Sequence, residues 1–212
     1  MPKLKTLLLR TNLLLLLFIS ACGSYKIPAD YQKVSINKPI FVGTYFSNPE
    51  VDYVYKTHIT VYGKELSGIF IVKKINETSH RVVFTTEFGN KLLDFEISET
   101  NVTINSIVDE LNVKLLIKTL TNDFKLLLNQ NYDFSEQLEN KEFRVFKVKK
   151  DGYFDYFYTN KTDGKLAQII QTSNSKEKIS IIFTVENNIF AQHISVQHRG
   201  IPLQLEFQYI NQ

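Results

Sequence analysis

Hydrophobic and polar residues alternate with a period of two along most of this 212-residue chain. The alternation is clearest in residues 201–210, where Leu203, Leu205, Phe207 and Tyr209 are separated by polar residues. This period is typical of β-strands that bury one face. It predicts eleven strands, at residues 53–62, 66–75, 80–87, 91–98, 101–107, 142–149, 153–159, 165–172, 177–186, 189–197 and 201–210.

Between the fifth and sixth of these segments the period changes to that of a helix. Leu116, Leu120 and Phe124 recur at helical spacing, so residues 112–129 are predicted to form an amphipathic helix. Consecutive strands joined by short turns pair antiparallel. We therefore expect a mainly β (α+β) fold: a curved antiparallel sheet of about eleven strands that forms an incomplete barrel, with the helix covering its concave face.

The N-terminus has the pattern of a secretory signal peptide. Basic residues at 3, 5 and 10 precede an apolar run over residues 13–19, which is too short to span a bilayer of about 30 Å. The run ends in Ile19-Ser20-Ala21-Cys22, which looks like a bacterial lipobox, and Cys22 is the one cysteine of the chain. We predict that residues 1–21 are a lipoprotein signal peptide and that Cys22 is lipidated. The alternatives are an ordinary signal peptide with an incidental cysteine, or an apolar start to a cytoplasmic protein.

Cleavage before Cys22 would leave 22 basic and 22 acidic residues, so the mature protein would be formally neutral. Acyl chains contribute about 0.8 kcal/mol per buried CH₂, which makes such an anchor effectively permanent. Gly23 and Ser24 lack the Asp that retains lipoproteins in the inner membrane of enteric bacteria. We expect an outer-membrane protein that faces the periplasm, with a lipidated tether at residues 22–38 and one domain at residues 39–212.

Composition and motifs exclude several classes of function. A net charge of +3 without a basic stripe gives no support to nucleic-acid binding, and one cysteine cannot form a disulfide framework. The chain has no HExxH, CxxC, GxSxG or phosphate-binding glycine loop, so we predict no enzyme activity, cofactor or metal. His58 and His193 fall on polar strand faces, as do Asp94 and Glu96, whose alternating charges favour a solvated face over a site.

The apolar faces leave two interpretations open. A curved sheet with a helix across it can enclose a cavity for acyl chains, or the same residues can fill a solid core. The aromatic run at 153–158 is predicted to be a strand packed on both faces in preference to a stacking platform. The candidate cavity residues are Ile59, Val61, Phe95, Ile97, Leu116, Leu120, Ile181, Phe183, Ile194, Leu205 and Phe207.

Both ends of the domain resemble LolB, the outer-membrane receptor for lipoproteins, and more distantly LolA, its periplasmic carrier relative. Residues 65–74, ELSGIFIVKK, are similar to one LolB strand, and residues 80–96, HRVVFTTEFGNKLLDFE, to the hairpin that follows it. Residues 191–210 resemble the closing hairpin of that family, with Tyr209 where a Trp is usual. Residues 112–129 depart from the family, since they lack its Pro-rich turn and Trp-containing helix.

The resemblance implies a receptor that accepts lipoproteins from a LolA-like carrier and inserts them into the outer membrane. Phe88 and Gly89 fall on the Leu-Gly pair of the LolB loop, so Phe88 is expected to enter the membrane. An exposed Phe costs roughly 1.5–3 kcal/mol relative to burial, which lipid contact could recover. The alternative for Phe88 is that its side chain folds back over the sheet. The alternative for the function is an accessory or structural envelope lipoprotein with a filled core, which binds a protein partner or another lipid.

Overall fold

The computed structural model describes residues 24–36, 40–43, 45–184 and 190–210. Within these residues the chain forms one helix, α2 (Lys114–Leu128), and fifteen strands. The strands are β1 (Gln32–Val34), β2 (Ile40–Val42), β3 (Asp52–Val61), β4 (Lys64–Lys74), β5 (Ser79–Thr85), β6 (Lys91–Ser98), β7 (Val102–Ile107), β8 (Asn131–Asp133), β9 (Glu136–Glu139), β10 (Phe143–Lys150), β11 (Tyr153–Asn160), β12 (Leu166–Ser173), β13 (Lys176–Thr184), β14 (His193–His198) and β15 (Leu203–Tyr209).

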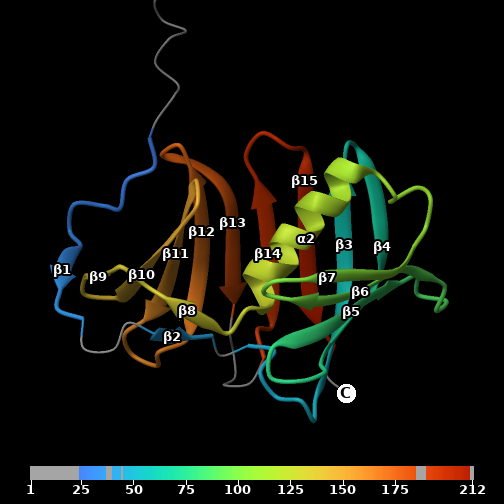
Figure 1. The fold of residues 1–212 in the computed structure, drawn as a ribbon, viewed down its shortest axis with the longest axis horizontal. Coiled ribbons are helices and arrows are strands. Elements are labelled where there is room, and N and C mark those ends of the chain that lie inside the picture. The colour runs from blue at the N-terminus through green and yellow to red at the C-terminus, as the bar shows by residue number, and fades with distance from the viewer. Residues whose placement is uncertain (1–23, 37–39, 44, 185–189, 211–212) are drawn as a thin grey trace, which may run out of the picture.

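Thirteen strands form one antiparallel sheet in the order β1-β9-β10-β11-β12-β13-β14-β15-β3-β4-β5-β6-β7, and β2 pairs separately with β8. The edge strands β1 and β7 do not pair with each other, so the described residues form an open sheet and not a closed barrel. Helix α2 crosses diagonally in front of β14, β15 and β3 (Figure 1). The predicted mainly β fold is confirmed: its eleven strands are β3 to β7 and β10 to β15.

Helix α2 is held on the sheet by its apolar face. Leu116, Leu120, Phe124 and Leu127 are buried. The ring of Phe124 lies 5.3 Å from that of Phe70 on β4. No side chain caps the N-terminus of the helix, so packing against the sheet, and not local capping, accounts for its position.

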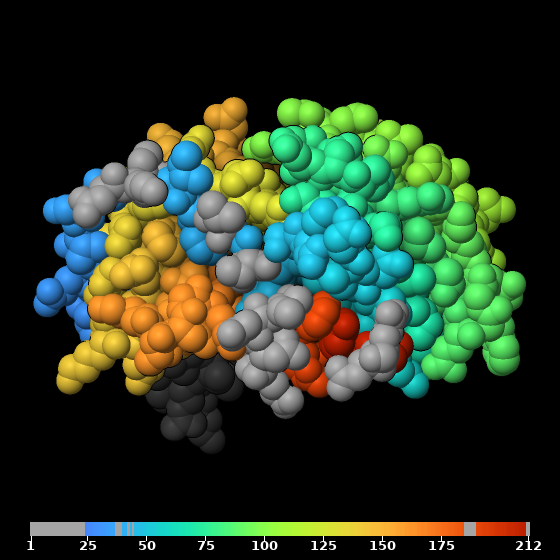
Figure 2. Space-filling view, turned by 90° about the horizontal axis from the view of Figure 1, so that it is seen from below, coloured from blue at the N-terminus to red at the C-terminus, as the bar shows by residue number. Residues whose placement is uncertain are grey.

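Tyr45 and Phe46 close one end of the concave face. The Tyr45 hydroxyl donates a hydrogen bond to the Leu166 carbonyl on β12 at 3.0 Å. On the other side, the Phe46 carbonyl lies 2.8 Å from Nε2 of His80 on β5. Figure 2 shows this end from below, with the early blue-to-cyan part of the chain between the orange strands and the green hairpins. The segment therefore bridges the two halves of the curved sheet.

The outer face of β10 to β12 carries a second hydrophobic cluster, covered by the N-terminal segment. Tyr156 and Tyr158 on β11 belong to this cluster, whereas Phe157 between them belongs to the main core. Residues 154–158 are thus packed on both faces, as predicted, whereas Tyr153 is exposed. Tyr25 packs on Tyr156 at 5.0 Å between ring centroids and shares a hydrogen bond with the Tyr158 hydroxyl.

The N-terminal segment is also attached through its backbone. The amide of Tyr25 donates to the carbonyl of Ser175 at 2.6 Å, and β1 pairs antiparallel with β9. Residues 24–34 therefore lie against the domain. The lipidated tether expected at residues 22–38 stays a prediction, because Cys22, Gly23 and residues 37–39 lie outside the described residues.

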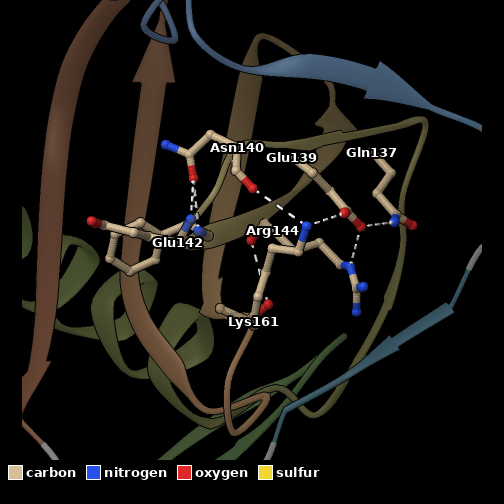
Figure 3. Close-up of polar contacts among 8 residues, drawn as sticks. Gln137, Glu139, Asn140, Glu142, Arg144 and Lys161 are labelled. Carbon is tan, nitrogen blue, oxygen red and sulfur yellow. Dashed lines mark hydrogen bonds and ion pairs between the residues drawn. The ribbon is translucent and has the colours of Figure 1, made fainter.

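The carboxylate of Glu139, on the strand β9 that pairs with β1, has three polar side-chain partners. It accepts hydrogen bonds from Arg144 at 2.6 Å and Gln137 at 3.0 Å, and pairs with Lys161 at 2.8 Å (Figure 3). Lys161 and Arg144 lower the pKa of Glu139 to about 2. A lowered carboxyl pKa contributes stability that is present above its unfolded value, about 4.5, and is lost as the pH falls towards 2.

Glu139→Gln should lower the free energy of unfolding by about 1–2 kcal/mol at neutral pH, because two partly buried cations lose their counter-charge. Urea denaturation between pH 2 and pH 7 measures this change. The variant should also lose part of the acid dependence below pH 4.5. Glu65→Gln, at an exposed position on β4, is the matched control. Equal stability of Glu139→Gln and the wild type across this range would contradict the account.

Gly68 is required where β4 meets β5. A Cβ atom at this position would lie 1.9 Å from the carbonyl oxygen of Thr85, closer than any real contact, and Thr85 adjoins an irregularity in the β5–β6 ladder. We expect Gly68→Ala to lower the free energy of unfolding by about 1–3 kcal/mol. Chemical denaturation measures this, with Glu65→Ala at an exposed position of β4 as control. Wild-type stability of Gly68→Ala would show that β5 can shift without cost.

Candidate functional site

Phe88 lies at the tip of the β5–β6 hairpin and is 94% exposed. The turn is closed by a hydrogen bond from the amide of Gly89 to the carbonyl of Thr86 at 3.0 Å. Gly89 has a φ of 85°, in the left-handed region that a glycine adopts without strain. Of the two alternatives for Phe88, the structure has the exposed one. The neighbouring Glu87 forms an ion pair with Lys56 at 3.2 Å.

The base of this hairpin is held by a buried carboxylate. The side chain of Asp94 on β6 is 1% exposed, and it pairs with Arg81 at 2.7 Å and Lys91 at 2.6 Å. Asn105 on β7 donates a third contact at 3.2 Å. Arg81, together with Lys91, holds the pKa of Asp94 well below its usual range. The expectation that Asp94 lies on a solvated face is therefore wrong, because three partners cover it, whereas Glu96 is exposed as expected.

Two of the eleven candidate cavity residues lie on α2 and nine lie on strands of the main sheet. All are buried and belong to one hydrophobic cluster: Ile59, Val61, Phe95, Ile97, Leu116, Leu120, Ile181, Phe183, Ile194, Leu205 and Phe207. At the C-terminal end of α2, a hollow of about 70 Å³ is lined by Ile97, Leu128 and His80, among others. Ligand pockets are commonly 300–1,000 Å³. This hollow is therefore too small for an acyl chain. In this arrangement α2 itself packs in one cluster with the apolar residues that an acyl chain would contact.

Two polar contacts join α2 to the sheet beside its apolar face. Asp123 is buried on the helix, and its Oδ1 lies 3.0 Å from Nε2 of His198 at the end of β14. Asn122 donates to the side chain of Gln171 on β12 at 3.2 Å. Sequence reasoning missed these residues. The available signal was Asp123 itself, a charged residue between Leu120 and Phe124 in the apolar stripe.

The Asp123–His198 pair shares a proton in a buried environment. The Leu203 carbonyl accepts a hydrogen bond from Nδ1 of His198 at 3.0 Å, so Nδ1 carries a proton. Burial raises the pKa of Asp123, more than the hydrogen bond from His198 lowers it. Burial alone would lower the pKa of His198, but Asp123 raises it above its ordinary value. Both pKa values are raised, so both shifts favour retention of the proton that lies between the Asp123 carboxyl group and the His198 imidazole.

The other histidines lie apart from one another. His58 hydrogen-bonds Ser67 at 2.9 Å on the outer face, and His193 contacts Glu206 at 3.0 Å, with its side chain 39% exposed. His80 is buried, and burial lowers its pKa. Across the described ranges, no three His, Cys, Asp or Glu side chains gather as a metal site would need. In the same ranges, no helix is long and apolar enough to cross a membrane.

Cys22 and the signal segment lie outside the described residues. Ser24, the first described residue, hydrogen-bonds the Ser175 carbonyl at 3.1 Å in the turn between β12 and β13. A chain spans at most about 3.6 Å per residue, so the Cα atom of Cys22 can lie no more than about 7 Å from that of Ser24. An anchor on Cys22 would therefore leave the domain close to this turn.

Comparison with solved structures identifies the class of fold. A LolA-superfamily protein from Nitrosomonas europaea matches 78% of this chain and 87% of its own, with a TM-score of 0.52 and 10% sequence identity. The two chains thus have similar folds, and at this identity the likeness shows the fold alone.

Two further structures are similar at lower TM-scores. An outer membrane lipoprotein-sorting protein domain from Vibrio parahaemolyticus matches 76% of this chain and 83% of its own, with a TM-score of 0.47 and 8% identity. A DUF1329 family protein from Desulfovibrio piger matches 76% and 84%, with a TM-score of 0.42 and 9% identity. No protein-family model and no curated protein matches the sequence.

Proposed function

We propose that this protein is a lipid-anchored receptor on the periplasmic side of the outer membrane, which accepts lipoproteins from a LolA-like carrier and inserts them into that membrane. One observation carries the proposal: a fold similar to that of a LolA-superfamily protein, which presents Phe88, 94% exposed, at the tip of a hairpin. Asp94 and its three partners hold the base of this hairpin, while the apolar side chain of Phe88 lies in water at the tip. An exposed apolar side chain in this position is suited to contact with lipid.

Cys22 supplies the anchor in this proposal. Acyl chains on Cys22 would hold the β12–β13 turn close to the bilayer, because at most two residues separate them from the Ser24–Ser175 contact. Attachment by two or three acyl chains is effectively permanent. The receptor thereby remains at the membrane into which it delivers its cargo.

The cargo acyl chains would bind between α2 and the concave face, against the eleven residues buried there. The helix must move outward to admit them, and the Asp123–His198 and Asn122–Gln171 contacts must break. Acyl chains can replace the apolar face of the helix as the cover for the sheet. No catalysis enters this scheme, because the acyl chains move towards better burial.

The packed interior favours a second candidate function. In this alternative the protein is an accessory or structural envelope lipoprotein whose filled core never opens, and it binds a protein partner or another lipid at its surface. The main support is that the helix and the eleven apolar residues form one continuous core.

Depletion of the protein in its own bacterium separates the two functions. The receptor function predicts that lipoproteins fall in the outer-membrane fraction and accumulate on the carrier or in the inner membrane. Expression of the wild-type chain from a second copy should restore the distribution, whereas a Cys22→Ser chain, which cannot be lipidated, should not. A normal content of outer-membrane lipoproteins after depletion would rule out the receptor function.

A further inference from the structure

The two edges of the main sheet differ in how they are protected. Strand β1 is three residues long, carries Lys33, and covers one edge. Strand β7 forms the other edge with six residues, Val-Thr-Ile-Asn-Ser-Ile, none of them charged and none of them proline. Natural sheets usually guard their edges with charges, prolines or short strands. An unguarded edge of this length is suited to pairing with another strand.

The backbone of β7 has free hydrogen-bonding groups that point outward. The amide of Ser98 donates to the carbonyl of Asn101, which makes these residues a hydrogen-bonded pair. Hydrogen-bonded pairs alternate along an antiparallel ladder. Ile97 pairs with Val102 and Phe95 pairs with Ile104, and these are the non-hydrogen-bonded pairs of the ladder. The backbone N–H and C=O groups of Val102 and Ile104 therefore point away from β6. Within the described ranges β7 pairs only with β6, and Ile104 is 42% exposed.

Acidic residues flank this edge at both ends. Glu99 precedes β7, Asp109 and Glu110 follow it, all three are exposed, and none forms an ion pair among the described residues. Antiparallel pairing with the β7 of a second copy would bring the acidic residues of one chain against those of the other. Like charges placed opposite each other are destabilising. The edge fits a strand from a different segment that carries lysine.

The opposite edge shows how such a strand binds. There β1, from the segment that follows Cys22, pairs with β9, and Lys33 of β1 forms an ion pair with Glu136 of β9 at 3.8 Å. In this molecule a lysine-bearing linker strand thus already pairs with a strand that carries glutamate. β7 has its acidic residues beyond its two ends and not within the strand, and its outer side is open among the described residues.

We propose that β7 binds the extended, lysine-containing linker that follows the lipidated cysteine of a cargo lipoprotein, as an added antiparallel strand. The inference rests on the proposed function and deepens it, because it names the part of the cargo protein that is recognised. The main-chain hydrogen bonds are independent of side-chain identity, so linkers of many sequences could bind.

Amide hydrogen exchange, followed by NMR on the full mature chain, tests the inference. The probe is a synthetic peptide with the sequence of residues 24–36 of this chain, which is itself a lipoprotein linker with Lys26 and Lys33. The peptide should slow exchange at Val102 and Ile104 at least tenfold and leave Thr103, already bonded to β6, unchanged. A peptide with Lys26→Glu and Lys33→Glu should give less than a third of that protection. Absence of protection at saturating peptide would overturn the inference.

Variants of the protein make the test specific. Ile104→Pro removes an outward donor without breaking the β6 ladder, so it should abolish protection of Val102. Where that variant fails to fold, Glu99→Lys with Glu110→Lys should weaken protection at least fivefold, with the exposed Glu65→Lys as control. Protection that increases with protein concentration in the absence of peptide would assign the edge to a second copy and overturn the inference.

A separate transfer measurement distinguishes this inference from the function on which it rests. Normal lipoprotein transfer by a variant that has lost peptide binding would overturn the β7 inference alone. Intact peptide binding by a wild-type protein that transfers no lipoprotein would overturn the proposed function and, with it, the identity of the partner as cargo.

Discussion

Replacement of His198 by leucine is expected to lower the free energy of unfolding by about 3–5 kcal/mol, because it leaves the buried Asp123 without a partner. The carboxylate would then lose its hydrogen-bond partner, and the Leu203 carbonyl would lose its donor. Helix α2 should loosen first, since Asp123 lies on it. Urea denaturation gives the free energy, and amide exchange within α2 shows whether the helix is the part that opens.

The effect should depend on pH in a defined direction. The pKa of His198 is raised in the folded protein, so its contribution is present below the unfolded value, about 6.5, and is lost as the pH rises through the folded value. The pKa of Asp123 is raised as well, which acts in the same direction. The stability difference between the wild type and a variant with leucine at both positions should therefore shrink from pH 6 to pH 9.

Two control variants separate this contact from general damage. Asp123→Leu combined with His198→Leu removes both polar groups and should recover most of the lost stability. His193→Leu breaks a half-exposed contact with Glu206 and should cost less than about 1 kcal/mol. A His198→Leu protein as stable as the wild type, or a double variant worse than either single change, would contradict the role given to the pair.

Replacement of Phe88 by glutamate should slow the release of lipoproteins into the bilayer by roughly 10- to 100-fold. Burial of a Phe side chain in lipid is worth about 1.5–3 kcal/mol, and a charge at the same position adds a penalty. The stability of the folded protein should not change, because Phe88 is 94% exposed and packs on nothing that the substitution removes. The measurement is the rate at which a fluorescent triacylated lipoprotein moves from this protein to liposomes.

The same experiment contains its own control. Tyr62, at the tip of the β3–β4 turn, is 56% exposed, and Tyr62→Glu should leave the release rate within about twofold of the wild type. Acceptance of the lipoprotein from the carrier should be unchanged in both variants, since the proposed acyl site lies under α2. An unaltered release rate in Phe88→Glu would remove the hairpin tip from the mechanism.

The fold could be predicted because most strands are long and bury one face. In β3 and β4, which have ten and eleven residues, buried positions alternate with more exposed ones along most of the strand, and a pattern of this length specifies both the strand and its buried side. The helix could be predicted for the same reason, from its change of period. Strands β1, β2, β8 and β9 were not predicted, since three or four residues are too few to establish a period.

The buried polar contacts could not be predicted because alternation shows which face a residue is on and not which side chains cover it. Asp94 meets Arg81 across two strands, and Asp123 meets His198 over a separation of 75 residues. Alternation places Asp94 on the polar face correctly but cannot show that Arg81, Lys91 and Asn105 cover it. The exposure of Phe88 was also open, because the turn geometry at Gly89 decides it.

The central claim is that this protein takes lipoproteins from a carrier, and native mass spectrometry tests it most directly. Purified mature protein is mixed with a LolA-like carrier loaded with one triacylated lipoprotein, and the masses of both complexes are followed over time. The account predicts that the lipoprotein leaves the carrier and appears in a one-to-one complex with this protein. A lipoprotein that stays on the carrier at every protein concentration would contradict the account and leave the filled-core alternative.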